Sequence, residues 1–107
     1  MLSKRMPVRS DGVAALGQPT RVGALVLTPQ AVVEDSRCPI NVRCVWAGRL
    51  VLKTRIDGAG WRETVDLTLG QPYATHGKGL ALVSAEPGKM AGSSPSPANS
   101  LFGFQTR

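Results

Sequence analysis

The chain has 107 residues, of which 13 are basic and 7 acidic, and its formal net charge is +6. This length supports one domain with a modest core. No apolar run approaches the ~18 residues of a membrane span, and the basic N-terminus lacks the apolar segment and cleavage site of a complete signal peptide, so the sequence predicts neither. The 12 glycines and 8 prolines favour short strands joined by many turns.

Residues 1–12 hold Lys4, Arg5 and Arg9 and show no apolar periodicity, which predicts a disordered N-terminal tail. The rest of the chain, 13–107, repeatedly alternates apolar and polar residues with period two and contains no apolar stripe of helical length. We therefore expect a single β-domain after the tail.

The first predicted strands are short. Residues 13–16 form one candidate, and the turn signal Gly-Gln-Pro at 17–19 follows it. Residues 21–28 are predicted to be a strand that ends at Pro29, because proline lacks the N–H group that a central ladder needs. Extended structure is expected to resume over 30–34.

The longest predicted strands span 44–57 and 61–69. The residues between them, Asp-Gly-Ala-Gly at 57–60, tolerate positive φ and predict a hairpin turn. The apolar positions of the two strands then share one face, as a half-buried hairpin requires. The predicted core comprises Val22 or Leu25, Val33, Trp46, Leu50, Leu52, Ile56, Val65, Leu67, Leu82, and Phe102 or Phe104.

The composition of 70–79 predicts a loop, and 80–85 a short strand. Residues 87–100 are rich in proline, glycine and serine and predict an irregular connection, after which 101–106 is expected to be the last strand. About seven short strands with frequent turns predict an all-β fold. We expect a small antiparallel β-sandwich, with a small β-barrel as the alternative.

Both cysteines, Cys38 and Cys44, lie in one short stretch. A closed zinc site normally needs four nitrogen or sulfur ligands, and His76 is the one other soft ligand of this kind in the chain. A redox pair would be spaced C-x-x-C beside a βαβ pattern, and neither feature is present. A disulfide is therefore the leading interpretation, with two free thiols as an alternative, and no metal or other cofactor is expected.

The residues before and after Cys38 fit a tight loop. Pro39 keeps Cys38 out of the helical region, and the short side chains of Asp35 and Ser36 can accept hydrogen bonds from nearby backbone N–H groups. This arrangement predicts an ordered start to the loop.

Trp46 would share a face with Cys44 in an extended strand. We expect its ring to pack near the disulfide and the loop 38–44 to lie tight against the sheet. Gly48 is expected to mark a β-bulge or a close approach by that ring.

The stretch DSRCPINVRCVWAG, from Asp35 to Gly48, resembles the signature D-S-R-C-P-x4-C-x-W-x-G of small bacterial envelope proteins, often lipoproteins. Looser matches are Gly17-Gln18 and the segment from Val83 to Pro87. The resemblance implies export and a β-rich domain, but no particular activity, and this chain lacks the lipobox cysteine. The signature residues besides the cysteines are Asp35, Ser36, Arg37, Pro39, Trp46 and Gly48.

Recognisable catalytic chemistry is absent from the sequence. His76 has no evident nucleophile or orienting acid and is interpreted as a solvated loop histidine. The charges of the 44–57 and 61–69 hairpin predict a basic outer face that is a candidate anion-binding surface. Both tryptophans fall on the opposite face, which disfavours nucleic acid as the partner. This basic face comprises Arg49, Lys53, Arg55 and Arg62.

These observations favour a non-catalytic exported β-domain with an interaction or structural role in the bacterial cell envelope. Its expected partner is a protein or another envelope component, and its expected location is the periplasm or the cell envelope, with the cytoplasm as the alternative. Binding of a polyanion or nucleic acid through the basic face, and an enzyme of unrecognised class, are the alternative functions.

Overall fold

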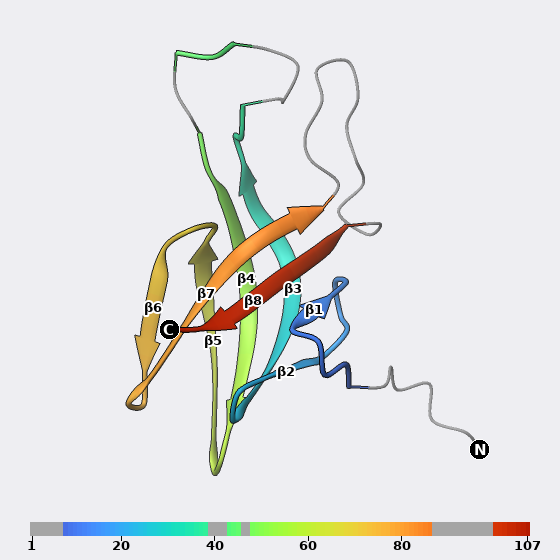
Figure 1. Cartoon of the computed structure of the whole chain (residues 1–107), viewed down its shortest axis with the longest axis vertical. Helices are drawn as coiled ribbons and strands as arrows, with labels where there is room; N and C mark the ends of the chain where they lie inside the picture. The colour runs from blue at the N-terminus through green and yellow to red at the C-terminus, as the bar shows by residue number, and fades with distance from the viewer. Residues whose placement is uncertain (1–7, 39–42, 46–47, 87–99) are drawn as a thin grey trace, which may run out of the picture.

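The computed structural model describes residues 8–38, 43–45, 48–86 and 100–107. These residues form two four-stranded antiparallel sheets that pack face to face, and the strands of one sheet cross those of the other obliquely (Figure 1). Sheet A has the order β2-β3-β4-β5 and sheet B the order β1-β8-β7-β6. The strands are β1 (Val13–Ala14), β2 (Thr20–Val22), β3 (Leu25–Asp35), β4 (Leu50–Gly58), β5 (Trp61–Thr68), β6 (Pro72–Thr75), β7 (Lys78–Glu86) and β8 (Leu101–Thr106).

The predicted β-sandwich is thus confirmed, and the sheets do not close into a barrel. Within the described ranges there is no helix of the length and apolarity needed to cross a membrane. The chain passes from sheet A to sheet B at residues 69–71, where Leu69 N–H donates to the Leu50 carbonyl and Gly70 N–H to the Leu82 carbonyl.

The segment 21–28, predicted to be one strand, is a hairpin between β2 and β3. Val22 lies opposite Leu25, and Gly23 turns the chain with a φ of +60°. The prediction was wrong because one glycine is the sole turn signal between two apolar runs.

Pro29 does not end β3, which continues to Asp35. A β-bulge between Pro29 and Ala31 lets the ladder pass a residue that has no N–H group. The Pro29 carbonyl also accepts a hydrogen bond from Gly17 N–H at 2.7 Å, which ties the turn after β1 to sheet A. The segments predicted over 21–28 and 30–34 therefore contribute to one long strand.

The hairpin of β4 and β5 is confirmed with the predicted faces, and its register places Gly58 opposite Trp61 and Lys53 opposite Asp66. Its first strand begins at Leu50 and not at residue 44. In sheet B, the predicted loop 70–79 contains β6, which pairs with β7 around a turn at His76 and Gly77. The glycines and the proline of 70–79 are typical of a loop and concealed this four-residue strand. Pro72 is tolerated because it is the first residue of β6, which lies at the edge of sheet B.

The core lies between the sheets and draws on both of them. Val33 was wrongly assigned to it: a second bulge, between Val32 and Glu34, shifts the alternation of β3, and Val33 is 55% exposed. Val65 is half-buried at the border of the core, and Trp46 lies outside the described residues. The buried cluster is Val22, Leu25, Leu27, Leu50, Leu52, Ile56, Leu67, Leu80, Leu82, Ala85, Phe102 and Phe104.

Residues 8–12, which the sequence assigns to the tail, include backbone contacts with both sheets. Arg9 forms a parallel bridge with Thr20 beside β2. Gly12 then accepts a hydrogen bond from Phe104 N–H at 2.8 Å, beside β8. The folded part of the chain therefore begins before residue 13.

Candidate functional site

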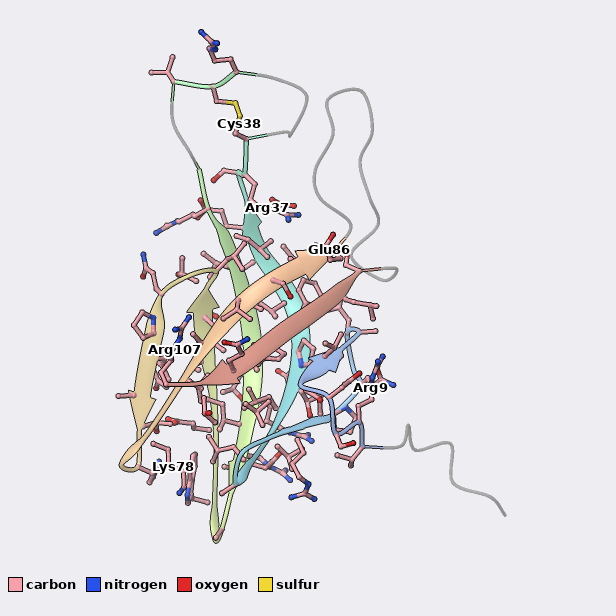
Figure 2. All side chains as sticks on the ribbon, viewed as in Figure 1. Arg9, Arg37, Cys38, Lys78, Glu86 and Arg107 are labelled. Atoms are coloured by element: carbon pink, nitrogen blue, oxygen red, sulfur yellow. A yellow bond between two sulfur atoms is a disulfide. The ribbon has the colours of Figure 1, made fainter. Side chains whose placement is uncertain are left out.

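A disulfide joins Cys38 to Cys44, with their Cα atoms 5.9 Å apart, as the sequence predicts. It lies beyond the ends of β3 and β4 and projects from one end of the sandwich (Figure 2). Arg43 and Cys44 are exposed, and Val45 is 94% exposed. The prediction that this loop lies tight against the sheet is therefore wrong for its described residues, because β3 and β4 carry it away from sheet B.

Hydrogen bonds between Ser36 and Arg49 close the base of this projection. Ser36 N–H donates to the Arg49 carbonyl at 2.8 Å, and Arg49 N–H donates to Ser36 Oγ at 3.0 Å. Gly48 lies against the same backbone: a Cβ there would be 1.7 Å from the Ser36 carbonyl oxygen, and its φ is +68°. Gly48 is thus needed for a close approach to a backbone carbonyl. It lies outside the strands and marks no β-bulge, whereas the predicted approach of the Trp46 ring falls outside the described residues.

Arg37 connects the loop to the second sheet. Its Nε donates to Asp35 Oδ1 at 2.8 Å and its Nη2 to Asp35 Oδ2 at 3.0 Å, which forms a two-pronged pair. Its Nη1 donates to the carbonyl of Ala85 in β7 at 3.4 Å. The hydrogen bond to Asp35 raises the pKa of Arg37. The two side chains of this pair are partly shielded from solvent, and their two-pronged contact can hold the start of the loop at a fixed angle to the sandwich.

Glu34 and Arg49 form a second, more exposed ion pair on the outer side of the base. Arg49 Nη2 lies 3.0 Å from Glu34 Oε1, and Ser36 Oγ donates to Glu34 Oε2 at 3.0 Å. The hydrogen bond from Arg49, followed by that from Ser36, lowers the pKa of Glu34, and the same pair raises the pKa of Arg49.

Acidification is expected to loosen this base. Because the pKa of Glu34 is lowered in the folded state, its contribution to stability is fully present above the ordinary value of 4.5 and is lost as the pH falls through the lower folded-state value. The protection factors of the Ser36 and Arg49 amides, which correct for the slower intrinsic exchange at low pH, should therefore fall at acidic pH. Glu34→Gln should remove most of this pH dependence, and an unchanged profile in that variant would contradict the assignment to Glu34.

The structure brings four of the predicted motif residues together around the loop: Asp35, Ser36, Arg37 and Gly48. Pro39 and Trp46 lie outside the described residues, so the predicted contact of the indole ring with the disulfide stays a prediction. Arg49, assigned by sequence to the basic face, instead belongs to the base of the loop. The contacts of Arg37 with β7 and of Arg49 with Glu34 are long-range pairings that the motif alone does not reveal.

The other predicted basic residues lie on the outer face of sheet A. Asp57 accepts a hydrogen bond from Arg55 Nε at 3.1 Å and another from Arg62 Nε, so one carboxylate lies between two guanidinium groups. Lys53 is exposed and opposite Asp66. These acids partly neutralise the face, which nevertheless keeps a basic excess.

A cluster that the sequence analysis missed surrounds His76. The imidazole stacks on the Trp61 ring with centroids 3.7 Å apart, and its Nδ1 is 2.9 Å from Thr75 Oγ1. Thr75 Oγ1 in turn donates to Glu63 Oε1. His76 is thus half-exposed but not a simply solvated loop residue, because it links the β6–β7 turn to β5. The sequence signals this cluster only through the period-two pattern of 61–69, which places Trp61 and Glu63 on one face. That pattern does not identify His76 and Thr75 as their partners.

Across the described ranges, no three histidine, cysteine, aspartate or glutamate side chains are arranged to hold a metal ion. Comparison of the chain with family models, with curated proteins and with solved structures finds no match.

Proposed function

We propose that the protein is a non-catalytic, exported domain of the bacterial cell envelope that presents its disulfide-closed loop to a protein partner. One observation carries this proposal: the described motif residues are used to brace a projecting loop. Asp35 and Arg37 pair with each other, Arg37 reaches β7, and Ser36 and Arg49 close the base. Because these contacts already hold the base of the loop, the loop loses little conformational entropy when it binds. This property suits an interaction surface.

The proposed location rests on the disulfide. Persistent disulfides belong to oxidising compartments, whereas cytoplasmic thiols are kept reduced. Because Cys44 is exposed, reductants can reach the disulfide, so a cytoplasmic location would not preserve it. The resemblance of Asp35–Gly48 to envelope proteins supports the same location.

The location is tested in the cells of origin by fractionation combined with thiol trapping at the moment of lysis. We expect the protein in the envelope or periplasmic fraction, with neither cysteine modified until a reductant is added. A cytoplasmic protein with both thiols modified would refute the proposed compartment.

The interaction is tested by photo-crosslinking from Val45, where a photoreactive amino acid replaces the exposed valine. We expect one discrete adduct from this position and none from Gln105, an exposed position on β8. The Cys38→Ser variant should lose the Val45 adduct while the sandwich stays folded. Equal adducts from both positions, or none from Val45, would contradict presentation of the loop.

A second candidate function is binding of a polyanion by the outer face of sheet A. The observation that favours it is the position of Asp57, which engages Arg55 and Arg62 through their Nε atoms and leaves their terminal nitrogens available on an exposed face. Lys53 extends this face along β4.

Replacing Lys53 and Arg62 with glutamate should abolish retention on heparin at low salt, because each reversal adds repulsion to the lost attraction. The fold should remain intact, since exposed charges contribute little to stability. The matched control is Lys78→Glu with Arg107→Glu, which makes the same change of net charge on sheet B. If wild type does not bind heparin at low salt, or if both double variants lose binding equally, this function is wrong.

A further inference from the structure

The edges of the two sheets differ in how they are closed. β2 has three residues, and Arg9 occupies its free side, where the Arg9 carbonyl accepts Arg21 N–H at 2.7 Å. β1 has two residues, and β6 begins with Pro72, which has no N–H group to offer. Short strands, coverings and prolines of this kind keep a sheet edge from pairing with another chain. By contrast, β5 spans eight residues without a proline or a bulge, and in the parts of the chain that the structure describes it pairs with β4 alone (Figure 1).

The register of β5 identifies the main-chain groups that face away from β4. Leu69 N–H donates to the Leu50 carbonyl at 2.9 Å just beyond the strand. Hydrogen bonds in an antiparallel ladder fall on alternate residues, so the odd-numbered residues of β5 bond to β4. The even-numbered residues direct their N–H and carbonyl groups to the open edge, and within the strand these are Arg62, Thr64 and Asp66.

The side chains of these three residues lie on the outer face of sheet A, and all three residues are exposed. Across the hairpin, Arg62 lies opposite Asp57 and Asp66 lies opposite Lys53. Arg62 donates to Asp57 through its Nε atom, which leaves its terminal nitrogens available. The open edge therefore carries a cation near one end and an anion near the other.

We propose that two copies of this chain associate through β5, antiparallel and centred on Thr64, so that their two A sheets form one continuous sheet. In this register Arg62 lies opposite Asp66 of the second copy, and two-fold symmetry repeats the pair on the other side of Thr64. Opposite charges that face each other across strands attract, as do paired threonines. Each facing pair of residues also exchanges two main-chain hydrogen bonds.

The charges of the edge select this register and this partner. The row of facing residues across the joined sheet reads Asp57, Arg62, then Asp66 and Lys53 of the second copy, with alternating sign. Centring the pair on Arg62 or on Asp66 would place like charges opposite each other, and centring it one residue from Thr64 would pair each charge with a neutral residue. A strand of another sequence lacks this match, so the edge favours a second copy.

This association is independent of the disulfide loop and goes beyond the function proposed above. Thr64 lies opposite Arg55, within β4, whereas the loop precedes Leu50, the first residue of that strand. A two-fold axis at Thr64 directs the two loops to opposite ends of the joined sheet. Each loop therefore stays free for its own partner.

The first test is the sedimentation of the purified protein as its concentration rises. Because the contact is small, we expect single chains at low micromolar concentration and dimers toward millimolar concentration. Thr64→Pro removes an N–H group that bonds the second copy and should abolish the dimer, whereas Thr64→Ala, its matched control, should keep it. Amide protection should rise with concentration at Arg62, Thr64 and Asp66, but not at Glu63 or Val65, which already bond to β4.

Charge reversal tests the register. Arg62→Asp and Asp66→Arg each replace unlike pairs with like pairs, and each should weaken dimerisation at least about tenfold. An equimolar mixture of the two variants restores unlike pairs between different chains and should dimerise again. It should do so more weakly than wild type, because Asp57 and Lys53 then lie beside like charges. Cys38→Ser should dimerise as wild type does, which separates this interface from the loop.

Three results would overturn the proposal. The first is the mass of a single chain up to millimolar concentration, which would leave the edge to a strand of another protein. The second is an unchanged dimer in a folded Thr64→Pro variant, because another surface would then join the copies. The third is a mixture of the folded charge variants that stays monomeric, which would exclude the proposed register. If Thr64→Pro fails to fold, the charge variants and their mixture decide the question.

Discussion

Replacing Phe102 with alanine is expected to lower the free energy of unfolding by about 3 to 5 kcal/mol. Phe102 is the largest of the fully buried side chains and is 1% exposed. Its cross-strand neighbours are Ala14 in β1 and Ala85 in β7. Because neither small side chain can occupy the space that the ring leaves, the cavity should stay open. Urea denaturation should show a lower midpoint with an unchanged m value.

Leu101→Ala is the matched control for this substitution. Leu101 precedes Phe102 in β8 but points to the other side of the sheet, and it is 39% exposed. Its truncation should cost far less stability, because solvent can occupy the vacated space. Equal losses in the two variants would mean that β8 does not contribute its Phe102 face to the core. An m value that falls in Phe102→Ala would indicate a change in the unfolding transition itself and would require the stability to be measured by amide exchange.

The β4–β5 hairpin shows what a sequence of this kind determines. Apolar and polar residues alternate along most of both strands, the turn contains two glycines, and a one-residue slip would place Lys53 and Arg55 in the core. The faces of both strands were therefore predictable from the residues alone. In β3 the same reasoning failed at Val33, because two bulges each shift the alternation, and a bulge has no consistent signal in a single sequence.

The base of the disulfide loop was predictable only in part. The pairing of Cys38 with Cys44 follows from the presence of two cysteines within a short stretch. The contact of Arg37 with the Ala85 carbonyl joins residues 48 positions apart, and it depends on how sheet B packs on sheet A. Local sequence does not specify such packing. The stack of His76 on Trp61 was missed for the same reason, because it joins a turn of sheet B to a strand of sheet A.

Replacing Cys38 with serine is expected to lower the free energy of unfolding by about 2 kcal/mol and the thermal midpoint by several degrees. The disulfide closes a short loop, with a sequence separation of 6. Its stabilising effect acts mainly on the unfolded chain, whose entropy it reduces, so the peripheral position of the loop does not cancel it. The effect does require an ordered loop in the folded protein. The hydrogen bonds of Ser36 with Arg49 and of Arg37 with Ala85 supply that order at the base.

The measurement compares wild type, Cys38→Ser and the Cys38→Ser/Cys44→Ser double variant, each with and without reductant. The thermal midpoint of wild type under reducing conditions should match that of the double variant, because both proteins then lack the cross-link and differ only in two side chains of similar size. A thiol count on freshly purified, denatured wild type should find no free thiol before reduction and two after it. Amide exchange then locates the effect: loss of the bond should accelerate exchange at the ends of β3 and β4 more than in β8. If wild type and the double variant have the same midpoint under non-reducing conditions, the bond does not stabilise the fold and this prediction is wrong.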